Sequence, residues 1–180
     1  MQLSFGQRVA GLEAPAFNET EVRAAAGLTM VIGAIAFSYA YFDKNYIPLQ
    51  AVTTFFFIEF LIRVTIGLQA SPVGLVSRWL TMSRPQEWVS AKPKRFAWTL
   101  GLGMSFSMMV ITNSGIRGYL PRTICLICLV LMWMESVLGL CLGCKIHALF
   151  VRRGWATRDP AYEVCAGGEC ELPVRTPTTT

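Results

Sequence analysis

Four long apolar stretches dominate the sequence and limit how the chain can fold. They cover residues 24–42, 46–70, 96–116 and 124–144. Their only charged side chains are Glu59, Arg63 and Glu135. Because a helix needs about 20 apolar residues to cross the hydrocarbon core of a bilayer, each stretch is long enough to span it. The sequence therefore predicts an all-α protein, built as a four-helix transmembrane bundle.

The composition supports a membrane protein over a soluble one. Of the 180 residues, 53% are hydrophobic and 15% are charged, and the mean hydropathy is +0.46. Soluble domains carry about 25% charged residues, so both disorder and a soluble enzyme are disfavoured. The net charge of +5 comes from short basic clusters between apolar blocks. That pattern is typical of membrane-protein loops, so we expect a lipid bilayer as partner and no nucleic acid.

The four spans divide the chain into three regions. A head covers residues 1–23, the bundle covers residues 24–144 with a basic loop at residues 71–95, and a tail covers residues 145–180. No region outside the bundle is long enough for an independent enzyme domain. The first 20 residues contain charges and no clean apolar core, so we expect a retained first helix in place of a signal peptide.

The distribution of positive charge predicts the orientation. Head, middle loop and tail hold twelve basic residues, and the two short loops hold three, Lys44, Arg117 and Arg122. Basic residues concentrate on the cytoplasmic side of bacterial membrane proteins. We therefore expect a multi-pass protein of the bacterial inner (cytoplasmic) membrane, with both termini in the cytoplasm.

The middle loop is also expected to contain a short helix. Residues 73–82 can form a short amphipathic helix at the membrane interface, with Val76, Trp79 and Leu80 on one face.

The six cysteines are the clearest chemical feature of the sequence. They form three close pairs in the last third of the chain: Cys125 and Cys128, Cys141 and Cys144, and Cys165 and Cys170. Residues three apart share a helix face, so each of the first two pairs can act as a unit. The alternative is that these cysteines are small apolar packing residues.

The first two pairs are expected to lie on one helix near opposite membrane surfaces. Sixteen residues separate Cys125 from Cys141, which is about 24 Å along a helix and a turn of about 160°. With Thr123 as a possible N-cap, Cys125 falls in the first turn, where the helix dipole favours the thiolate. Cys141 and Cys144 are expected at the C-terminal end, where the dipole opposes it.

A metal site is the second possibility for the cysteines. Cys141, Cys144 and the only histidine, His147, follow one another at three-residue spacing, and the tail adds Cys165 and Cys170. Nitrogen and sulfur ligands of this kind suit tetrahedral zinc or copper(I). The cytosol keeps thiols reduced, which favours a metal or a reactive thiol over a structural disulfide on that side.

Three charged residues are expected inside the membrane. Glu59 and Arg63 are four residues apart and can pair along one helix face, either as a structural lock or as a relay for protons or anions. Glu135 lies seven residues after Cys128 on nearly the same face. It could accept a thiol proton, pair with Arg63, or remain a neutral acid.

Several segments together resemble a known family. They include residues 18–24, 58–63 with Ser71-Pro72, residues 93–97, Glu135-Ser136 and Cys-Leu-Gly-Cys-Lys at residues 141–145. Over residues 18–170 the chain resembles a bacterial integral-membrane family catalogued as domain of unknown function forty-three ninety-five. The resemblance implies a four-span inner-membrane protein with a cysteine pair in its tail. Relatives encoded beside or fused to thioredoxin-like or rhodanese-like proteins imply thiol or sulfur chemistry.

Three functional hypotheses follow from these features. The first is a membrane thiol protein that handles reducing equivalents or sulfane sulfur through all three cysteine pairs. The second is a metal-binding or metal-transfer protein of the cytoplasmic face, using Cys141, Cys144, His147, Cys165 and Cys170. The third is a non-catalytic accessory subunit of a larger membrane complex, in which the cysteines are mostly inert.

Overall fold

The computed structural model describes Gly6 and residues 15–155, and in this part the chain is mostly helical. The predicted all-α class is therefore confirmed, with one small addition, a two-stranded sheet. In chain order the elements are β1 (Ala16–Asn18), α1 (Glu19–Phe42), α2 (Ile47–Thr65), the 3₁₀ turn η1 (Leu68–Ala70), α3 (Pro72–Thr81), β2 (Trp88–Ser90), α4 (Ala91–Asn113), α5 (Tyr119–Leu138) and α6 (Leu142–Arg152).

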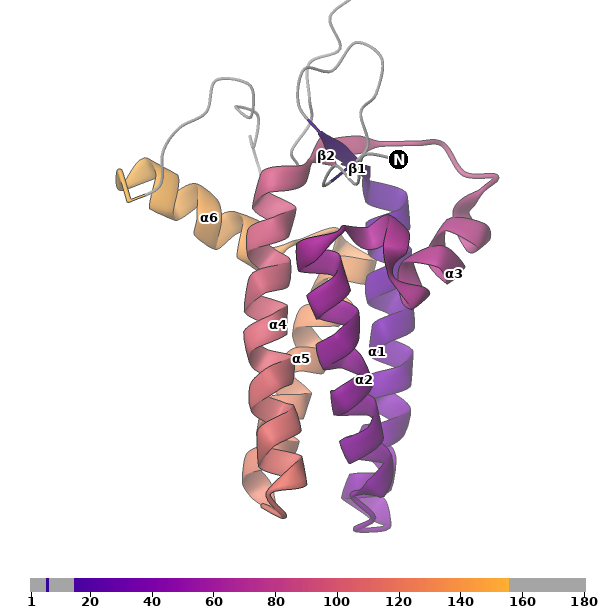
Figure 1. Ribbon diagram of the computed structural model, residues 1–180, viewed down its shortest axis with the longest axis vertical. Coiled ribbons are helices and arrows are strands. Elements are labelled where there is room, and N and C mark those ends of the chain that lie inside the picture. Colours follow the sequence, from indigo (N-terminus) through magenta and orange to yellow (C-terminus); the bar gives the residue numbers. More distant parts are fainter. Residues whose placement is uncertain (1–5, 7–14, 156–180) are drawn as a thin grey trace, which may run out of the picture.

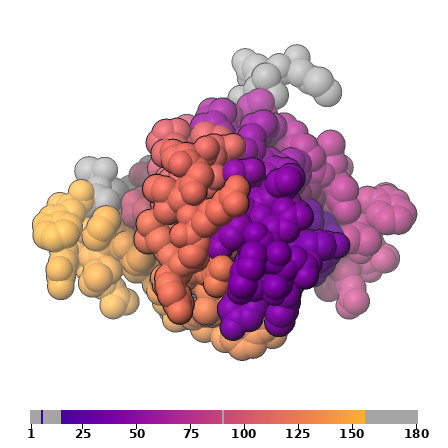
Figure 2. Space-filling view, turned by 90° about the horizontal axis from the view of Figure 1, so that it is seen from below, coloured from indigo at the N-terminus to yellow at the C-terminus, as the bar shows by residue number. Residues whose placement is uncertain are grey.

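Four long helices form the body of the molecule. Helices α1, α2, α4 and α5 run side by side as an elongated bundle (Figure 1). The sheet, α3 and α6 lie at one end, which we call the sheet end, and the short connections α1–α2 and α4–α5 lie at the other, the turn end. Viewed from the turn end, α3 and α6 project to opposite sides of the bundle (Figure 2).

The small sheet joins the beginnings of α1 and α4. Its strands are antiparallel, with Phe17 opposite Val89, and both side chains are buried. The Phe17 ring packs edge-on against Trp98 at 4.9 Å. Asn18 caps α1, because its side-chain oxygen accepts a hydrogen bond from the Thr20 amide at 3.1 Å. The sheet therefore fixes where two of the bundle helices, α1 and α4, begin.

Small residues let the bundle helices approach one another. Helix α4 packs mainly on α2, and α5 mainly on α1. A Cβ placed on Gly33 of α1 would lie 3.3 Å from Leu129 of α5, and one on Gly101 of α4 would lie 2.7 Å from the Phe60 ring of α2. Close contact through small residues is the usual way in which membrane helices associate.

The turn end is held together by Tyr46. Its hydroxyl accepts hydrogen bonds from the Gly118 amide and from Nε of Arg122, both at 3.0 Å. Gly118 precedes Tyr119, so this contact ties the start of α5 to the α1–α2 connection. The expected N-cap at Thr123 is wrong, because α5 begins at Tyr119 with Gly118 as N-cap.

The helices agree with the predicted spans only in part. By length and composition, α1, α2 and α5 are apolar enough to cross a membrane, which suggests a membrane protein. Helix α4, which contains most of the expected span 96–116, has 23 residues and is not among the three. Polar residues spread along α4 make it less apolar than the other three helices: Thr99, Ser105, Ser107, Thr112 and Asn113. The expected span 124–144 ends at Leu138.

The short helix expected over residues 73–82 is present as α3. Ser71 caps it, since its hydroxyl accepts from the Gly74 amide at 3.1 Å. Val76, Trp79 and Leu80 are all exposed, with Trp79 at 71%. Helix α3, which carries these side chains, projects sideways from the sheet end of the bundle (Figure 1).

Candidate functional site

Cys141 and Cys144 lie at the beginning of a helix, not at the end of one. Cys141 is the N-cap of α6, with extended backbone, and Cys144 follows in the first turn. Both side chains are buried, and both cysteines are free thiols. The expected position at the C-terminal end of the fourth span is therefore wrong. The positive end of the α6 dipole favours a thiolate here.

Two features explain why α5 stops before the cysteines. Gly139 has a left-handed backbone, with φ of 67°, which is the usual C-terminal cap conformation of a helix. Arg23 of α1 donates hydrogen bonds to the last carbonyls of α5, at 3.3 Å to Ser136 and 3.0 Å to Val137. Carbonyl groups that lack a partner in the helix are thus satisfied by a side chain from α1.

A buried lysine stands close to this pair of thiols. Lys94, on the first turn of α4, is 4% exposed. Its Nζ lies 2.8 Å from Oε2 of Glu19 and 3.4 Å from Oε1 of Glu135. Burial by itself lowers the pKa of Lys94, but the carboxylates of Glu135 and Glu19 outweigh burial, so the pKa is raised. The ammonium group therefore stays charged.

The two thiols of the α6 pair are unequal. A side-chain hydrogen bond from Cys144 lowers the pKa of Cys141 and outweighs burial and the negative charge of Glu135, which both raise it. The positive charge of Lys94 lowers this pKa further. The same hydrogen bond raises the pKa of Cys144, and burial raises it further. Cys141 is thus the thiol that ionises first, with Cys144 as its hydrogen-bond donor.

An internal cavity of about 320 Å³ runs along the inside of the bundle. Helices α1, α2, α4, α5 and α6 all contribute to its wall. It reaches from Cys125 and Cys128 on α5, past Arg63 and Glu135, to Cys141. The two cysteine pairs were expected on faces about 160° apart on one straight helix. Because the chain breaks at Gly139, Cys141 lines the same cavity as Cys125 and Cys128.

Cys125 and Cys128 have a different environment from the α6 pair. Cys125 is the seventh residue of α5, so it does not lie in the first turn as expected. It belongs to the apolar core of the turn end, together with Tyr46, Leu49 and Met108. Cys128 is half-buried and lines the cavity.

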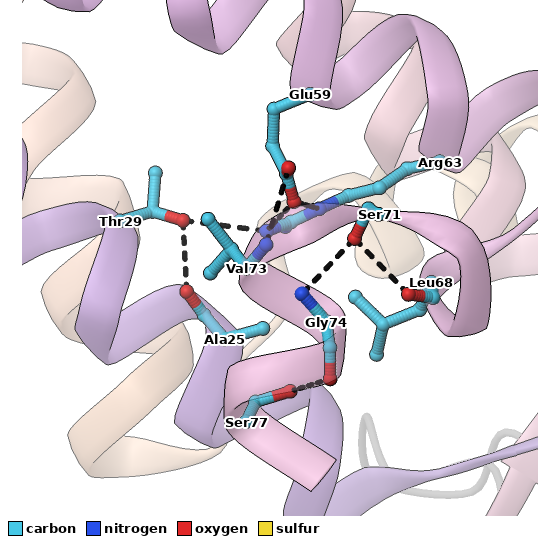
Figure 3. A network of polar contacts seen from close by, with 9 residues as sticks. All are labelled: Ala25, Thr29, Glu59, Arg63, Leu68, Ser71, Val73, Gly74 and Ser77. Carbon is cyan, nitrogen blue, oxygen red and sulfur yellow. Dashed lines mark hydrogen bonds and ion pairs between the residues drawn. The ribbon is translucent and has the colours of Figure 1, made fainter. Parts of the chain in front are cut away.

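Glu59 and Arg63 form the expected ion pair, and they join three helices. Arg63 lies 2.8 Å from Oε1 of Glu59, and both side chains are almost fully buried. Arg63 also donates to Thr29 of α1 at 3.4 Å, and Oε2 of Glu59 accepts from the Val73 amide at the start of α3. Figure 3 shows this network together with the Ser71 cap of α3. Its geometry is that of a structural lock between α1, α2 and α3.

Glu135 does not form the ion pair with Arg63 that was one of the alternatives from the sequence. Glu135 lies against Lys94, while the ion pair of Arg63 is with Glu59. Glu135 also lines the cavity together with Cys128, as the seven-residue spacing predicts.

No group of three metal-ligating side chains occurs among the described residues. His147 is on α6, and its ring packs against Phe96 at 5.4 Å. Burial lowers the pKa of His147, and the nearby Lys92 lowers it further. Cys165 and Cys170 lie outside the described residues, so the complete five-residue ligand set stays a prediction.

Lys94 is the site residue that the sequence interpretation missed. It was counted among the basic residues of the middle loop, because it stands between Lys92 and Arg95. Pro93 could have indicated that a helix begins here, since proline is common in the first turn of a helix. Lys94 therefore belonged to a helix start, where its side chain can turn inward.

Comparison with known proteins places the chain in a family. No curated protein and no solved structure is significantly similar to it. The family model described as "Domain of unknown function (DUF4395)" matches residues 17–152, which include both described cysteine pairs and end before Cys165. This match agrees with the resemblance seen in the sequence, and the chain belongs to the DUF4395 family.

Proposed function

We propose that the protein is an integral membrane thiol protein that handles reducing equivalents or sulfane sulfur through paired cysteines. The observation that carries the proposal is the setting of Cys141, which occupies the N-cap position of α6, is hydrogen-bonded to Cys144 and lies near the buried cation Lys94. Helix N-termini and neighbouring cations are the settings in which a cysteine becomes nucleophilic. A purely structural thiol pair has no need of these features.

The elementary step is attack by the Cys141 thiolate on a sulfur atom of the substrate. On a disulfide, the attack forms a mixed disulfide and expels the other sulfur as a thiolate. Cys144 then attacks Cys141, forms the intramolecular disulfide and releases the second substrate thiol. On a persulfide, the thiolate attacks the outer sulfur and the S–S bond of the persulfide breaks. The carrier leaves as a thiolate, and Cys141 becomes the persulfide. A thioredoxin-like or rhodanese-like protein is the kind of partner that supplies either substrate.

The proposed setting is a four-helix transmembrane bundle in the bacterial inner membrane, with α4 as the fourth span. The outward face of α5 supports it, because large apolar side chains are exposed along the helix: Leu126, Ile127, Val130, Trp133 and Val137. Lys92, Lys94 and Arg95 precede the apolar part of α4, and Arg152 and Arg153 end α6. Under the positive-inside rule the sheet end faces the cytoplasm, as do both termini.

The other cysteines have secondary parts in this proposal. Cys125 and Cys128 serve the opposite side of the membrane, at the turn end. Cys165 and Cys170, which lie outside the described residues, act as a shuttle that exchanges with Cys141. The 20 residues between Cys144 and Cys165 are enough chain to allow either a return to α6 or a separate position.

The decisive experiment counts thiols in freshly extracted membranes with an alkylating reagent that adds mass. Samples are compared with and without reductant and with and without a chelator. Increased tagging of Cys141 and Cys144 after reductant is the expected result. An increase only with chelator would instead indicate zinc or copper(I) bound by Cys141, Cys144, His147 and the tail pair. Cysteines that are all inert would favour an accessory subunit of a larger membrane complex.

A further inference from the structure

The internal cavity has the size and the wall of a small-molecule site. Its volume of about 320 Å³ falls within the range of about 300–1,000 Å³ that is common for ligand pockets. From Cys128 to Glu135 the α5 wall alone extends over seven residues, or about 10 Å. The cavity therefore suits an elongated ligand lying parallel to the helices.

The side chains that line the cavity favour an apolar ligand that contains a flat conjugated ring. Aromatic rings from Phe56, Phe60 and Trp98 line it. Most of the remaining wall is aliphatic or thioether: Met30, Leu49, Val52, Met104, Met108, Leu129, Leu131 and Met132. Aromatic rings and methionine sulfurs both make favourable contacts with a planar ring. Such a ligand enters from the lipid phase, not from water.

The charged side chains of the wall, Arg63 and Glu135, lie at one end of the cavity. Arg63, Glu135 and Cys141 lie toward the sheet end, near Trp98. Leu49, Met108 and Cys125 lie toward the turn end, in an apolar core. A ligand with oxygen atoms on its ring and an apolar chain would place the ring beside Arg63 and Cys141, because only that end offers charged partners.

We infer that the cavity binds a quinone, with the ring at the sheet end next to Cys141 and the apolar chain directed toward Cys125. The inference rests on the proposed function and deepens it, since it names the electron acceptor of the Cys141–Cys144 pair. Cys141 lines the cavity, whereas Cys144 is buried outside its lining and hydrogen-bonded to Cys141. Cys141 is thus the sulfur that meets the ring.

The reaction balances as a two-electron exchange. The Cys141 thiolate forms a bond to a ring carbon of the quinone. Cys144 then gives up its proton and attacks the Cys141 sulfur, forming the disulfide. The bond between sulfur and ring carbon breaks, and its electron pair stays on the ring. In total, two electrons and two protons pass from the dithiol to the quinone, which leaves as the hydroquinone. The two thiols of a reduced thioredoxin-like protein then return the Cys141–Cys144 disulfide to the dithiol, by the reverse of the exchange described above, and leave as a disulfide.

The binding test uses a short-chain quinone and purified full-length protein in lipid nanodiscs. Ser105 is buried in the cavity wall, whereas Ser107, on the same helix, is exposed. Both hydroxyls bond to backbone carbonyls of α4, so the two positions are a matched pair. We expect Ser105→Leu to weaken binding by about tenfold or more and Ser107→Leu to change it by less than about twofold. Equal affinity of both folded variants and wild type would overturn the site.

A second measurement does not depend on a variant that folds. A photoreactive quinone is crosslinked to the wild-type protein, and the labelled peptides are identified by mass spectrometry. Labels on α4 and α5 residues of the cavity wall, displaced by unlabelled quinone, are expected. Labels confined to the outer, lipid-facing side chains would contradict the proposal.

The redox test separates this inference from the proposed function. Reduced wild-type protein should convert one equivalent of quinone to hydroquinone, and Ser107→Leu, whose changed side chain is exposed, should do the same. Cys141→Ser/Cys144→Ser should still bind quinone but not reduce it. If the thiols react with disulfides but the protein binds no quinone, the quinone inference is refuted and the proposed function stands. Quinone binding without any thiol reactivity would refute the proposed function and its electron transfer, leaving only a binding site.

Discussion

Gly143 of α6 and Ala97 of α4 meet backbone to backbone. A Cβ placed on Gly143 would lie 2.5 Å from the Cβ of Ala97 and 2.6 Å from its Cα. Atoms of this kind do not approach so closely, so only glycine allows the contact. The contact lies one residue before Cys144 and three residues after Lys94. It therefore sets how near the thiol pair lies to the buried charges.

The first prediction concerns this contact. Gly143→Ala should push α6 away from α4, move Cys141 away from Lys94 and slow its alkylation near neutral pH. Gly103→Ala is the matched control, because a Cβ there meets nothing within 4 Å. Alkylation rates at each cysteine, followed by mass spectrometry, check both variants. Identical Cys141 rates in Gly143→Ala and wild type would contradict the role given to the contact.

The second prediction concerns the charge of Lys94. An ammonium group near a thiol stabilises the thiolate, so removing the charge raises the thiol pKa. Lys94→Met should shift the pH profile of Cys141 alkylation upward by about one unit. Lys145→Met removes an exposed charge next to Cys144 in the sequence and should leave the profile in place.

One variant distinguishes this charge effect from misfolding. Lys94→Met leaves the partly buried carboxylates of Glu19 and Glu135 without their cation, which costs stability. Lys94→Met/Glu19→Gln removes one of these charges and should recover part of the stability while the profile stays shifted, since Glu19 is not among the groups that shift the pKa of Cys141. A profile that returns to the wild-type position in the double variant would show that Lys94 does not support the thiolate.

The third prediction concerns the break between α5 and α6. A non-glycine residue in the left-handed region costs about 1–2 kcal/mol, so Gly139→Ala should favour a continuous helix through Cys141. Cys141 then loses its N-cap position and becomes less reactive. Gly115→Ala is the matched control, since Gly115 also has a left-handed backbone, with φ of 75°. It lies at the turn end, far along the chain from Cys141. It should lower the melting temperature similarly without changing Cys141 reactivity.

The fourth prediction concerns the Glu59–Arg63 lock. Removing one partner of a buried ion pair typically costs about 3–5 kcal/mol, because the other charge is left without a partner. Glu59→Gln should therefore lower the free energy of unfolding by that amount, measured by thermal unfolding in detergent with circular dichroism. It also weakens the hydrogen bond from the Val73 amide. Arg78→Met, an exposed change on α3, should have little effect.

A double variant tests whether the pair acts only as a lock. Glu59→Gln/Arg63→Met removes both charges and should be less destabilised than Glu59→Gln alone. If the pair instead relays protons or anions, the double variant would lose thiol activity even where the protein remains folded. Unchanged thiol reactivity in the folded double variant is the expected outcome.

Some features of the site could be predicted because they depend on local spacing. Glu59 and Arg63 are four residues apart on one apolar helix, and two charges that share a face in such a helix must find partners. The amphipathic helix α3 follows from Ser71-Pro72, which is a strong helix start, and from the spacing of its apolar residues. The all-α class follows from the four apolar stretches in the same way.

Other features depend on contacts between distant segments. The end of α5 at Leu138 could have been read from Gly139, but its cap comes from Arg23, more than 100 residues earlier. The inward position of Lys94 depends on Glu19 and Glu135, which stand on two other helices. The pairing of β1 with β2 joins segments about 70 residues apart and was not expected at all.

The sequence by itself determined the class of the protein, its apolar helices, its paired cysteines and the Glu59–Arg63 pair. These features need only the helix repeat and the cost of placing charge in an apolar medium. Only the tertiary structure decided that Cys141 begins a helix beside Lys94 and shares a cavity with Cys125 and Cys128. The physical reason is that the break at Gly139 redirects the chain, and the packing of α1, α4 and α6 then decides which charges meet the thiols.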